Sequence, residues 1–572
     1  MPAGKDAGRI RFNEAARVAL LHYTAPISMW GAFRGDMAQI LFEKFSSGLD
    51  RRKTRDSAGA DALYELTNAQ VTGGHELSKR ACAASYATLE PGSRGLFSAL
   101  GVLNTFATDL TVAHGSPAFE ARFVPHPTDS SRTIAQIHYC EAFRGYLYVV
   151  VEYDNGDTYH HYLDAGSTSS TPKFASPAWA ATTAYATTSP HFVTPTTPNG
   201  FRYQCTTGGT SGGTEPTWPT TIGGTVVDGT VTWTCRSFVI VDANCPHSQS
   251  VVKVQNRIFA VNGEVVRFCA LANARDWTTA SDAGFLPTGS HQDDSSDALA
   301  VAKFKKNLAV FFADAVQVWF IDPDPDLMVL QDVVPNTGTR FPRSPGQVSQ
   351  DTLFLSDNGF RSLQLSANTD QMQDTDIGAP IDELVKPLIT DVLEPFSTWF
   401  SPAGQFWCVF DSTVWAFTFS RTSKVNAWSK HSFPWTIDDA TVLNGRLYLR
   451  EGDNVYRMDE AVHADAGMAP RVVIEFPFLD FKAPGVLKLI QGCDFVGEGS
   501  ATISFKYRAT DINGNPTEGQ TGEVTLVNNS MPGVMTPVEL CVVSIAPRIT
   551  HQANEAFRMA KLAFYYELLS AG

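Results

Sequence analysis

The 572-residue chain has few charged side chains, only 18% of the total, and its net charge is −15. A protein that holds nucleic acid through the phosphate backbone needs a basic surface. This acidic balance therefore excludes gripping nucleic acid as the main task of the chain. The acidic excess lies beyond residue 100, because the first 100 residues carry 13 Lys and Arg against 10 Asp and Glu.

Long apolar runs and paired cysteines are also missing. No stretch approaches 18 consecutive apolar residues, and no apolar core of signal-peptide length precedes Arg9 and Arg11. The nine cysteines are scattered without a CxxC pair, which argues against a disulfide framework or a cysteine-based zinc site. We therefore expect no transmembrane helix, and a protein made and folded in a reducing cytoplasm.

What the sequence does contain is a repeat. Five segments share one design, in which two apolar runs flank a tight turn, and they start at residues 256, 307, 351, 404 and 445. The turns carry hairpin chemistry, such as Asn262-Gly263 and Asn358-Gly359. Intervals of 41 to 53 residues around a β-hairpin are typical of a propeller with one four-stranded blade per repeat.

A sixth copy starts at Arg144, but it lies 112 residues before the next one. The gap contains residues 172–237, a segment dense in Thr, Gly, Pro and Trp. Removing this segment restores the period, so we predict a small β module inserted between two strands of one blade. Exposed loops tolerate such insertions because the added closure entropy is small.

The two ends of the chain lack the repeat. Glu14–Leu21, Asp36–Phe45 and Ala58–Leu66 have helical composition, whereas residues 469–572 keep strand-like runs between Gly, Pro and Asn turns. We predict a mainly β chain: an α+β platform at 1–136, a multi-bladed β-propeller at 137–468 interrupted by the module at 172–237, and a β-sandwich-like domain at 469–572.

Several patterns that could carry chemistry have simpler explanations. Gly209–Gly213 matches the G-x-S-x-G elbow of hydrolases, but Thr214–Pro219 cannot begin the helix that this elbow requires, so a flexible surface turn is expected. His160 and His161 point to opposite faces of a strand, and neither they nor Cys245-Pro246-His247 have further ligands at metal spacing.

Acidic pairs could be the two carboxylates of a glycosidase, since such enzymes also use propellers. Asp293-Asp294, Asp322–Asp326 and Asp438-Asp439 are the candidates, but nothing in the sequence sets the separation between two of them. Loop aspartates in solvent are the simpler interpretation. We predict no catalytic, cofactor or metal site.

Two segments are candidate contact sites. The basic run of Arg51, Arg52, Lys53 and Arg55 is expected either to contact DNA phosphates or an acidic partner, or to be a solvated loop. The inserted module is rich in aromatic residues, which either stack on sugar rings or build the core of a small domain. The candidate glycan contacts are Trp179, Tyr185, Tyr203, Trp218 and Trp233.

The order of these parts resembles the tail nozzle proteins of short-tailed bacteriophages, also called packaged-DNA stabilisation proteins. The likeness rests on four stretches, namely 68–83, 255–289 with Arg275-Asp276-Trp277, 349–365, and 547–567. The inserted module is similar to one that recurs in phage tail and fibre proteins, through Asn199–Cys205, Thr210–Pro219 and Asp228–Trp233.

The resemblance implies a virion structural protein of the tail, assembled in the bacterial host cytoplasm. In such proteins a ring, expected here to be a hexamer, lies below the portal and adaptor rings, retains packaged DNA and conducts it at ejection. The implied partners are further copies of the chain, the portal and adaptor proteins, tail fibres or tailspikes, and double-stranded DNA that passes without sequence recognition. A wall with few Lys and Arg would suit that passage.

The alternative is a host-surface glycan-binding or glycoside-cleaving propeller protein of the tail. In that case the aromatic module would be the binding element. A nozzle that also contacts host glycans through the module combines the two hypotheses.

Overall fold

The computed structural model describes residues 38–569, apart from residues 60, 108–118, 125, 128, 130, 164–177, 188–191, 198, 200, 222, 238, 241, 292–296, 367–375, 392, 511–514 and 527–534. The described chain is mainly β-strand, with only short helices such as α1 (Leu363–Ser366) and α2 (Asp382–Val385). It divides into two compact units. The first combines Met1–Cys82, Trp415–Ser432 and Glu460–Gly572, and the second contains Ala83–Val414 and Phe433–Asp459.

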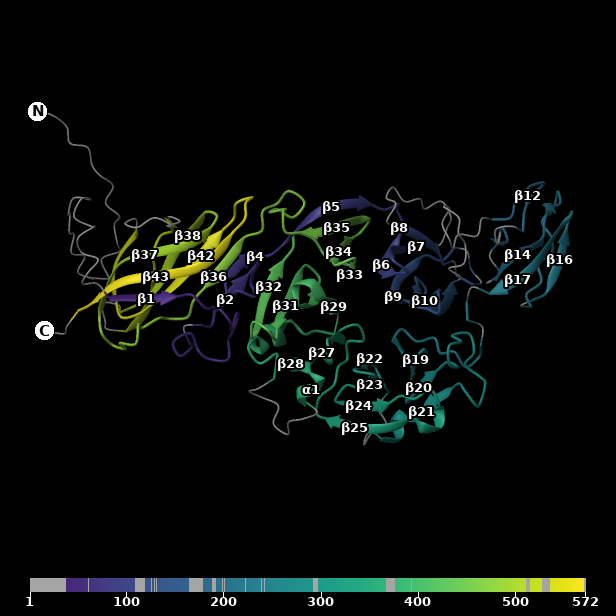
Figure 1. Ribbon diagram of the computed structural model, residues 1–572, viewed down its shortest axis with the longest axis horizontal. Helices are drawn as coiled ribbons and strands as arrows, with labels where there is room; N and C mark the ends of the chain where they lie inside the picture. The colour runs from purple at the N-terminus through teal and green to yellow at the C-terminus, as the bar shows by residue number, and fades with distance from the viewer. Residues whose placement is uncertain are drawn as a thin grey trace, which may run out of the picture. The chain divides into compact units, whose positions relative to one another are not determined.

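The second unit is a β-propeller, in which seven sheets follow one another along the described residues (Figure 1). The first blade contains β6 (Arg94–Ala99), β7 (Val102–Ala107) and β8 (Phe119–Phe123). The second contains β9 (Ile134–Phe143), β10 (Tyr146–Tyr153) and β11 (Thr158–Leu163). The third contains β18 (Val251–Val254), β19 (Arg257–Asn262), β20 (Val265–Phe268) and β21 (Gly284–Leu286). The fourth blade contains β22 (Ala300–Phe304), β23 (Asn307–Phe311), β24 (Ala315–Phe320) and β25 (Val329–Pro335). The fifth contains β26 (Gly346–Val348), β27 (Asp351–Ser356) and β28 (Gly359–Ser362).

The sixth blade contains β29 (Phe396–Phe400) and β30 (Gln405–Phe410), and the chain leaves the second unit within β31 (Thr413–Ser420). The seventh contains β33 (Asp439–Leu443), β34 (Arg446–Glu451) and β35 (Asn454–Asp459). The first strands of the blades line the centre, and β33 lies beside β6, so the ring is closed. Between β9 and β18 the Lys253 Nζ donates to the Ala142 carbonyl at 2.8 Å.

An early segment of the second unit completes its last blade. β5 (Cys82–Thr88) takes the outer position of the sheet that contains β33, β34 and β35. The Leu89 amide donates to the Asp453 carbonyl at 2.7 Å, and the rings of Tyr86 and Tyr448 pack edge to face at 5.1 Å. One blade is therefore built from segments at opposite ends of the propeller sequence.

Four of the five hairpins predicted from the repeat are confirmed as pairs of consecutive strands within their blades. The segments starting at 256, 307, 351 and 445 form the pairs β19–β20, β23–β24, β27–β28 and β34–β35. The copy at Arg144 begins in the turn that leads into β10, which pairs with β11. That turn has positive φ at both Arg144 and Gly145, the geometry that matches the twist of a two-residue hairpin.

The inserted module forms small sheets of its own. β13 (Phe192–Val193), β14 (Phe201–Thr207), β17 (Val231–Ser237) and β16 (Thr225–Asp228) make one sheet, and β12 (Ala184–Tyr185) pairs with β15 (Gly209–Thr210). The segment follows β11 and precedes Val239, which bridges to His161 on β11. The module thus interrupts the second blade just before its fourth, very short strand.

Two sheets form the first unit, and strands from both ends of the chain enter each sheet. One contains β3 (Ala69–Val71), β4 (Leu77–Lys79), β43 (Arg558–Leu568), β37 (Lys488–Glu498) and β41 (Thr536–Val542), with β1 (Ala38–Phe42) beside β43. The other contains β32 (Val425–Ser432), β2 (Glu65–Thr67), β36 (Val472–Glu475), β42 (Ile545–His551), β38 (Ala501–Thr510) and β39 (Pro516–Gln520), with β40 (Val524–Leu526) also beside β38.

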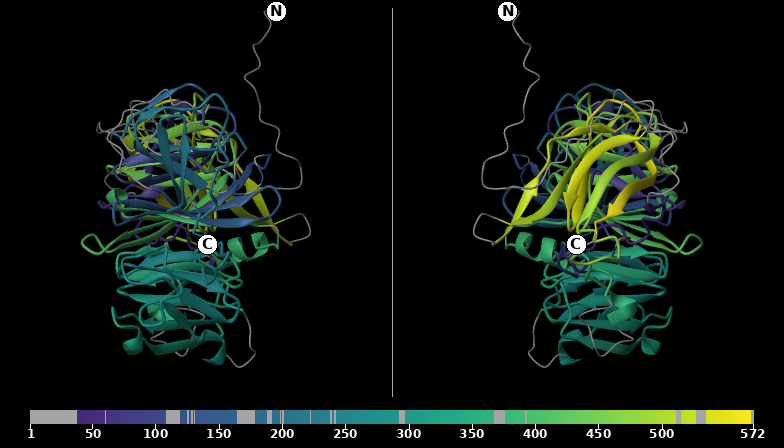
Figure 2. Two further views of the ribbon diagram at one scale, coloured as in Figure 1. Left: turned by 90° about the vertical axis from the view of Figure 1, so that its right-hand side faces the viewer. Right: turned by 90° about the vertical axis from the view of Figure 1, so that its left-hand side faces the viewer.

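The two sheets of the first unit share an aromatic core. Phe505 of β38 and Phe564 of β43 pack edge to face with their ring centroids 6.0 Å apart, and Phe42 of β1 lies 5.6 Å from Phe476, the residue after β36. Figure 2 shows the long C-terminal strands in yellow, running side by side as a twisted sheet. This is a β-sandwich, and it includes N-terminal strands that the sequence had placed in a separate platform.

Two of the helices predicted near the N-terminus, Asp36–Phe45 and Ala58–Leu66, overlap the described residues, and both predictions are wrong. Residues 38–42 form β1 and pair with β43, and residues 58, 59 and 61–64 contain no helix before β2 begins at Glu65. Pairing with a long C-terminal strand outweighs local helical propensity here. The predicted helix at Glu14–Leu21 lies outside the described residues. The boundary expected at residue 136 falls inside the second unit, because β6–β8 belong to the propeller.

A buried ion pair holds the first unit together, and it generates a test. Arg80 and Asp465 are each 1% exposed, and the Arg80 guanidinium also donates to the Asn68 side chain and the Ser432 carbonyl. Replacing Arg80 with Met leaves a buried carboxylate without its cation, so we expect about 3 to 5 kcal/mol less stability for this unit. Hydrogen exchange of first-unit amides measures this loss.

The matched control is the double variant Arg80→Met/Asp465→Leu. It removes both charges, and we expect it to recover part of the lost stability, because an apolar pair of similar size has no desolvation penalty. Equal exchange rates in the single variant and the wild type would contradict the role given to this pair.

Candidate functional site

The aromatic residues of the inserted module mainly build its core. Trp179, Tyr203 and Trp233 are at most 9% exposed, so their faces are not available for stacking on a sugar. Tyr185 and Trp218 pack against the same cluster and remain partly accessible. A module this small needs large aromatic side chains to bury enough apolar area, which explains why so many occur here.

One buried carboxylate organises this core. Asp228 Oδ2 accepts hydrogen bonds from the indole nitrogens of Trp179 and Trp233, at 2.7 and 3.0 Å. Its other oxygen, Oδ1, accepts from the Gly212 amide at 2.7 Å, and the residue is 4% exposed. Asp228 therefore joins three separate segments of the module. Ser211 donates to the Ala180 carbonyl at 2.7 Å, so the G-x-S-x-G segment is a packed structural element rather than a flexible turn.

Asp228→Asn is the first test of this module. An amide offers one acceptor atom where the carboxylate offers two, so at least one N–H donor would lose its partner. We expect a loss of about 2 to 3 kcal/mol in the stability of the module. Limited proteolysis at residues 172–237 measures it, with Asp314→Asn in an exposed turn as the control. Equal cleavage rates for Asp228→Asn and the control would contradict the organising role.

Three of the four basic residues of the run contact groups of their own unit. Arg51 Nε donates to the Tyr64 carbonyl at 2.5 Å, and Arg52 pairs with Asp50 at 2.7 Å. Arg55 pairs with Glu475, a residue that is only 2% exposed on its side chain. Lys53 is exposed and has no ion-pair partner among the described residues. Most of the charge expected to meet a phosphate or a partner is therefore already compensated within this unit.

The histidines and Cys245 form a buried hydrogen-bond network beside the second blade. His160 Nε2 donates to the Ser248 carbonyl at 2.7 Å, and its Nδ1 accepts from the Tyr148 hydroxyl at 2.6 Å. Burial raises the pKa of the Cys245 thiol well above its usual range, which keeps it protonated and unreactive. Burial also lowers the pKa of His160 to about 4 and that of His161 to about 3. These groups are structural.

The buried histidines predict a dependence of stability on pH. Their folded-state pKa values lie below the unfolded value, so the unfolded chain binds more protons between about pH 6.5 and pH 4. The stabilisation is present above pH 6.5 and is lost as the pH falls through this window. For His160 alone the loss is about 3 kcal/mol.

Thermal unfolding of the propeller between pH 7 and pH 4 measures this effect. His160→Gln keeps a donor and an acceptor but does not titrate, so its midpoint should depend less steeply on pH than that of the wild type. Identical slopes for the two proteins would contradict the assignment.

The predicted acidic clusters lie in different surroundings. Asp324 caps a short 3₁₀ turn by accepting from the Asp326 amide, and both are exposed. Asp293 and Asp294 lie outside the described residues. Asp438 and Asp439 border a cavity in the second unit, so this pair leads to the candidate site.

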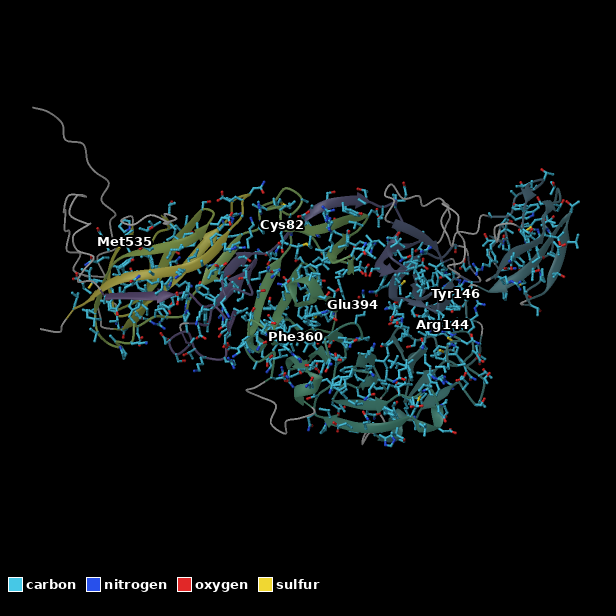
Figure 3. All side chains as sticks on the ribbon, viewed as in Figure 1. Cys82, Arg144, Tyr146, Phe360, Glu394 and Met535 are labelled. Atoms are coloured by element: carbon cyan, nitrogen blue, oxygen red, sulfur yellow. The ribbon has the colours of Figure 1, made fainter. Side chains whose placement is uncertain are left out.

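A polar cavity of about 610 Å³ lies at the centre of the propeller. Its lining comes from the inner strands β6, β9, β29 and β33, from Glu152 on β10 and Arg450 on β34, and from connecting segments. The charged residues that line it are Arg94, Glu152, Arg343, Glu394, Asp411, Asp438, Asp439 and Arg450. Figure 3 labels Glu394, on the segment before β29.

Three guanidinium groups from separate blades meet in this cavity, and we call Arg94, Arg343 and Arg450 the arginine cluster. Arg343 and Arg450 donate to the two oxygens of Asp439, at 3.1 and 3.0 Å. Arg450 and Arg94 both donate to the Ser93 carbonyl, at 3.1 and 3.0 Å. Burial raises the pKa of Asp439, although the two arginines beside it act in the opposite direction.

Gly95 shapes the wall next to the arginine cluster. It has a φ of +71° at an irregularity of β6, and a Cβ there would lie 2.9 Å from the Ile137 side chain. A side chain at this position would push β6 away from β9. Glycine thus lets Arg94 enter the cavity where the two inner strands approach closely.

The remaining lining is mainly carboxylate. Glu152 Oε2 lies 2.6 Å from His138 Nε2, and burial lowers the pKa of that histidine while Glu152 and Glu394 act to raise it. Glu394, Asp411 and Asp438 are exposed, so the cavity reaches solvent on their side. The site therefore offers clustered cationic donors together with several carboxylate acceptors.

The sequence did not reveal this site. Asp438-Asp439 was considered as an acidic pair, but Arg94, Arg343, Arg450 and Glu394 stand in unrelated local sequences. Only closure of the ring brings them together, and no motif of fixed spacing could have identified them. Within the described residues, no group of three or more His, Cys, Asp or Glu side chains could hold a metal ion. In the same residues, no helix has the length and apolar character needed to cross a membrane.

Comparison with known proteins finds only distant structural similarities. No protein-family model matches the chain, and no curated protein matches it. Among solved structures it is similar to the WD40 domain of coronin from Toxoplasma gondii, with 9% identity and a TM-score of 0.31 over 74% of this chain and 85% of that one. The chain is a β-propeller protein by its sheet order, and identities this low say nothing about activity.

Two further similarities are weaker. An exo-β-1,3-galactanase from Phanerochaete chrysosporium has 11% identity and a TM-score of 0.21, over 55% of this chain and 95% of that one. The AfRom2 CNH domain has 9% identity and a TM-score of 0.23, over 50% and 89% respectively.

Proposed function

We propose that this chain is a structural tail protein that associates into a ring, the nozzle that retains and then conducts packaged DNA. The proposal starts from the resemblance of four sequence stretches and the inserted module to such proteins. One structural observation supports it physically: exposed apolar side chains gather on two different sheets, as the head-to-tail contacts of a ring require.

The first apolar surface lies on the propeller, and we call it the blade patch. It consists of Leu327 and of Val329 and Val333 on β25, which are 37 to 56% exposed. β25 is the outer strand of its blade and an edge strand of its sheet. Exposed apolar edges are suited to pairing with another chain and are usually avoided in monomers.

The second apolar surface lies on the sandwich unit, and we call it the sandwich patch. It consists of Leu487, the residue before β37, and Leu568 at the end of β43, which are 47% and 52% exposed and lie close together because Leu568 pairs with Lys488. A ring is built from heterologous contacts, in which one surface of each copy meets a different surface of the next. Two distinct patches on one chain provide such a pair of surfaces.

The charge of the chain is compatible with a conduit for DNA. A net charge of −15 and a basic run that is mostly compensated internally leave few free cations to hold phosphates. The portal and adaptor rings, tail fibres or tailspikes, passing DNA and a place in the virion tail belong to this proposal as its expected partners and location.

A non-enzymatic role is part of the same proposal. Ser211, the candidate nucleophile of the G-x-S-x-G segment, and Cys245, a candidate metal ligand, are buried in structural hydrogen bonds. The glycan-binding alternative is weakened for the inserted module, because three of its five candidate contacts are core residues. Tyr185 and Trp218 are the two that would remain for such contacts.

The test is a complementation of assembly variants. Val329→Glu/Val333→Glu disrupts the blade patch, and Leu487→Glu/Leu568→Glu disrupts the sandwich patch. We expect wild-type protein to form rings in negative-stain images and each variant alone to remain monomeric. An equimolar mixture should stop at dimers, because each variant keeps one intact patch and only one contact can form. Analytical ultracentrifugation distinguishes these states.

The matched control is Val227→Glu, which charges a 70% exposed valine of the inserted module. It should assemble as the wild type does. Wild-type protein that stays monomeric while binding or depolymerising host polysaccharide would overturn the proposal. Rings formed equally well by both patch variants would remove its structural support.

A further inference from the structure

The central cavity of the propeller gathers three guanidinium groups and five carboxylates, which the ring proposal leaves unexplained. Among the described residues, Arg343 and Arg450 share one carboxylate ion-pair partner, Asp439, and Arg94 forms no ion pair. Arg450 has 4% of its side chain exposed, and its Nε is buried without a hydrogen-bond acceptor. Arg94 donates only to the carbonyl of its own neighbour, Ser93. Donor capacity therefore remains in the cavity.

A planar anion is the group that such donors recognise best. Guanidinium forks bind carboxylates through paired, charge-assisted hydrogen bonds, and those bonds are stronger where water is scarce. The guanidinium of Arg343 is fixed in position on two sides. Its carbon lies 5.0 Å from the centroid of the Phe396 ring, and its Nη2 donates to Asp439. The arginines are thus pre-positioned around the space that an anion would enter.

The rest of the lining restricts which anion can bind. Glu394, Asp411 and Asp438 border the same cavity and would repel a ligand that carries several negative charges. Carboxylates accept hydrogen bonds, so they favour a ligand with several hydroxyl donors. A volume of about 610 Å³ is within the usual range for small-molecule sites.

We propose that this cavity binds a sugar acid, with its single carboxylate on the arginine cluster and its hydroxyls on Glu394, Asp411 and Asp438. The ligand would be either a free uronate or the uronate at the end of a glycan chain. This binding does not require ring assembly, so the two proposals can fail separately.

The experiment is isothermal titration of the full-length chain with glucuronate, with a glucuronate-terminated disaccharide, and with glucose and inorganic phosphate as controls. We expect glucuronate or the disaccharide to bind with a millimolar or lower Kd. Glucose lacks the carboxylate and phosphate lacks the hydroxyls, so both should bind at least about tenfold more weakly. Tighter binding of the disaccharide identifies a glycan end as the source, and tighter binding of glucuronate identifies the free sugar acid.

Variants locate the site. Arg94→Gln should weaken glucuronate binding by about tenfold or more, and Arg94→Lys should weaken it less, because the charge remains while the fork is lost. Arg446→Gln, an exposed change on the strand that carries Arg450, should leave the Kd unchanged. Circular dichroism checks that each variant is folded.

Three results would overturn the proposal. They are no binding of either uronate, equal binding of glucose or phosphate, and folded Arg94→Gln and Arg94→Lys proteins that both bind as the wild type does.

Discussion

Closure of the ring of blades is the constraint on which the second unit depends. An open row of sheets would expose an apolar face at each end, and here β5 covers the last blade by joining β33, β34 and β35. The closing contacts join Leu89 to Asp453 and Tyr86 to Tyr448. Because closure brings β6 beside β33, it also creates the central cavity, so the fold and the candidate site have the same origin.

Buried charged groups differ in how completely their partners compensate them. Arg80 and Asp465 compensate each other, and Asp228 is satisfied by three N–H donors, so these groups hold segments together. The arginine cluster departs from this balance, since its guanidiniums outnumber the carboxylates paired with them. Compensated buried groups are explained by stability alone, whereas an arginine cluster with few ion pairs of its own, in a cavity open to solvent, has donors left for a ligand.

The sequence predicted local features well and long-range ones poorly. Hairpins such as β19–β20 were predictable because turn residues and apolar runs lie next to one another. The first blade was missed, since β7 and β8 pair in parallel and are separated by a connection without hairpin chemistry. The local sequence of β1 predicts a helix, because the partner that makes it a strand, β43, lies at the other end of the chain. The arginine cluster required ring closure, which no local pattern encodes.

The pairing of β1 with β43 has a consequence for synthesis on the ribosome. β1 and β4 are made early, but their partner strand β43 is translated after the whole propeller. The propeller can therefore complete its blades before the early strands can pair with β43. Until then, apolar side chains such as Phe42, which is buried in the folded unit, are exposed to solvent. The nascent sandwich unit, rather than the larger propeller, is the part of this chain for which a chaperone would matter most.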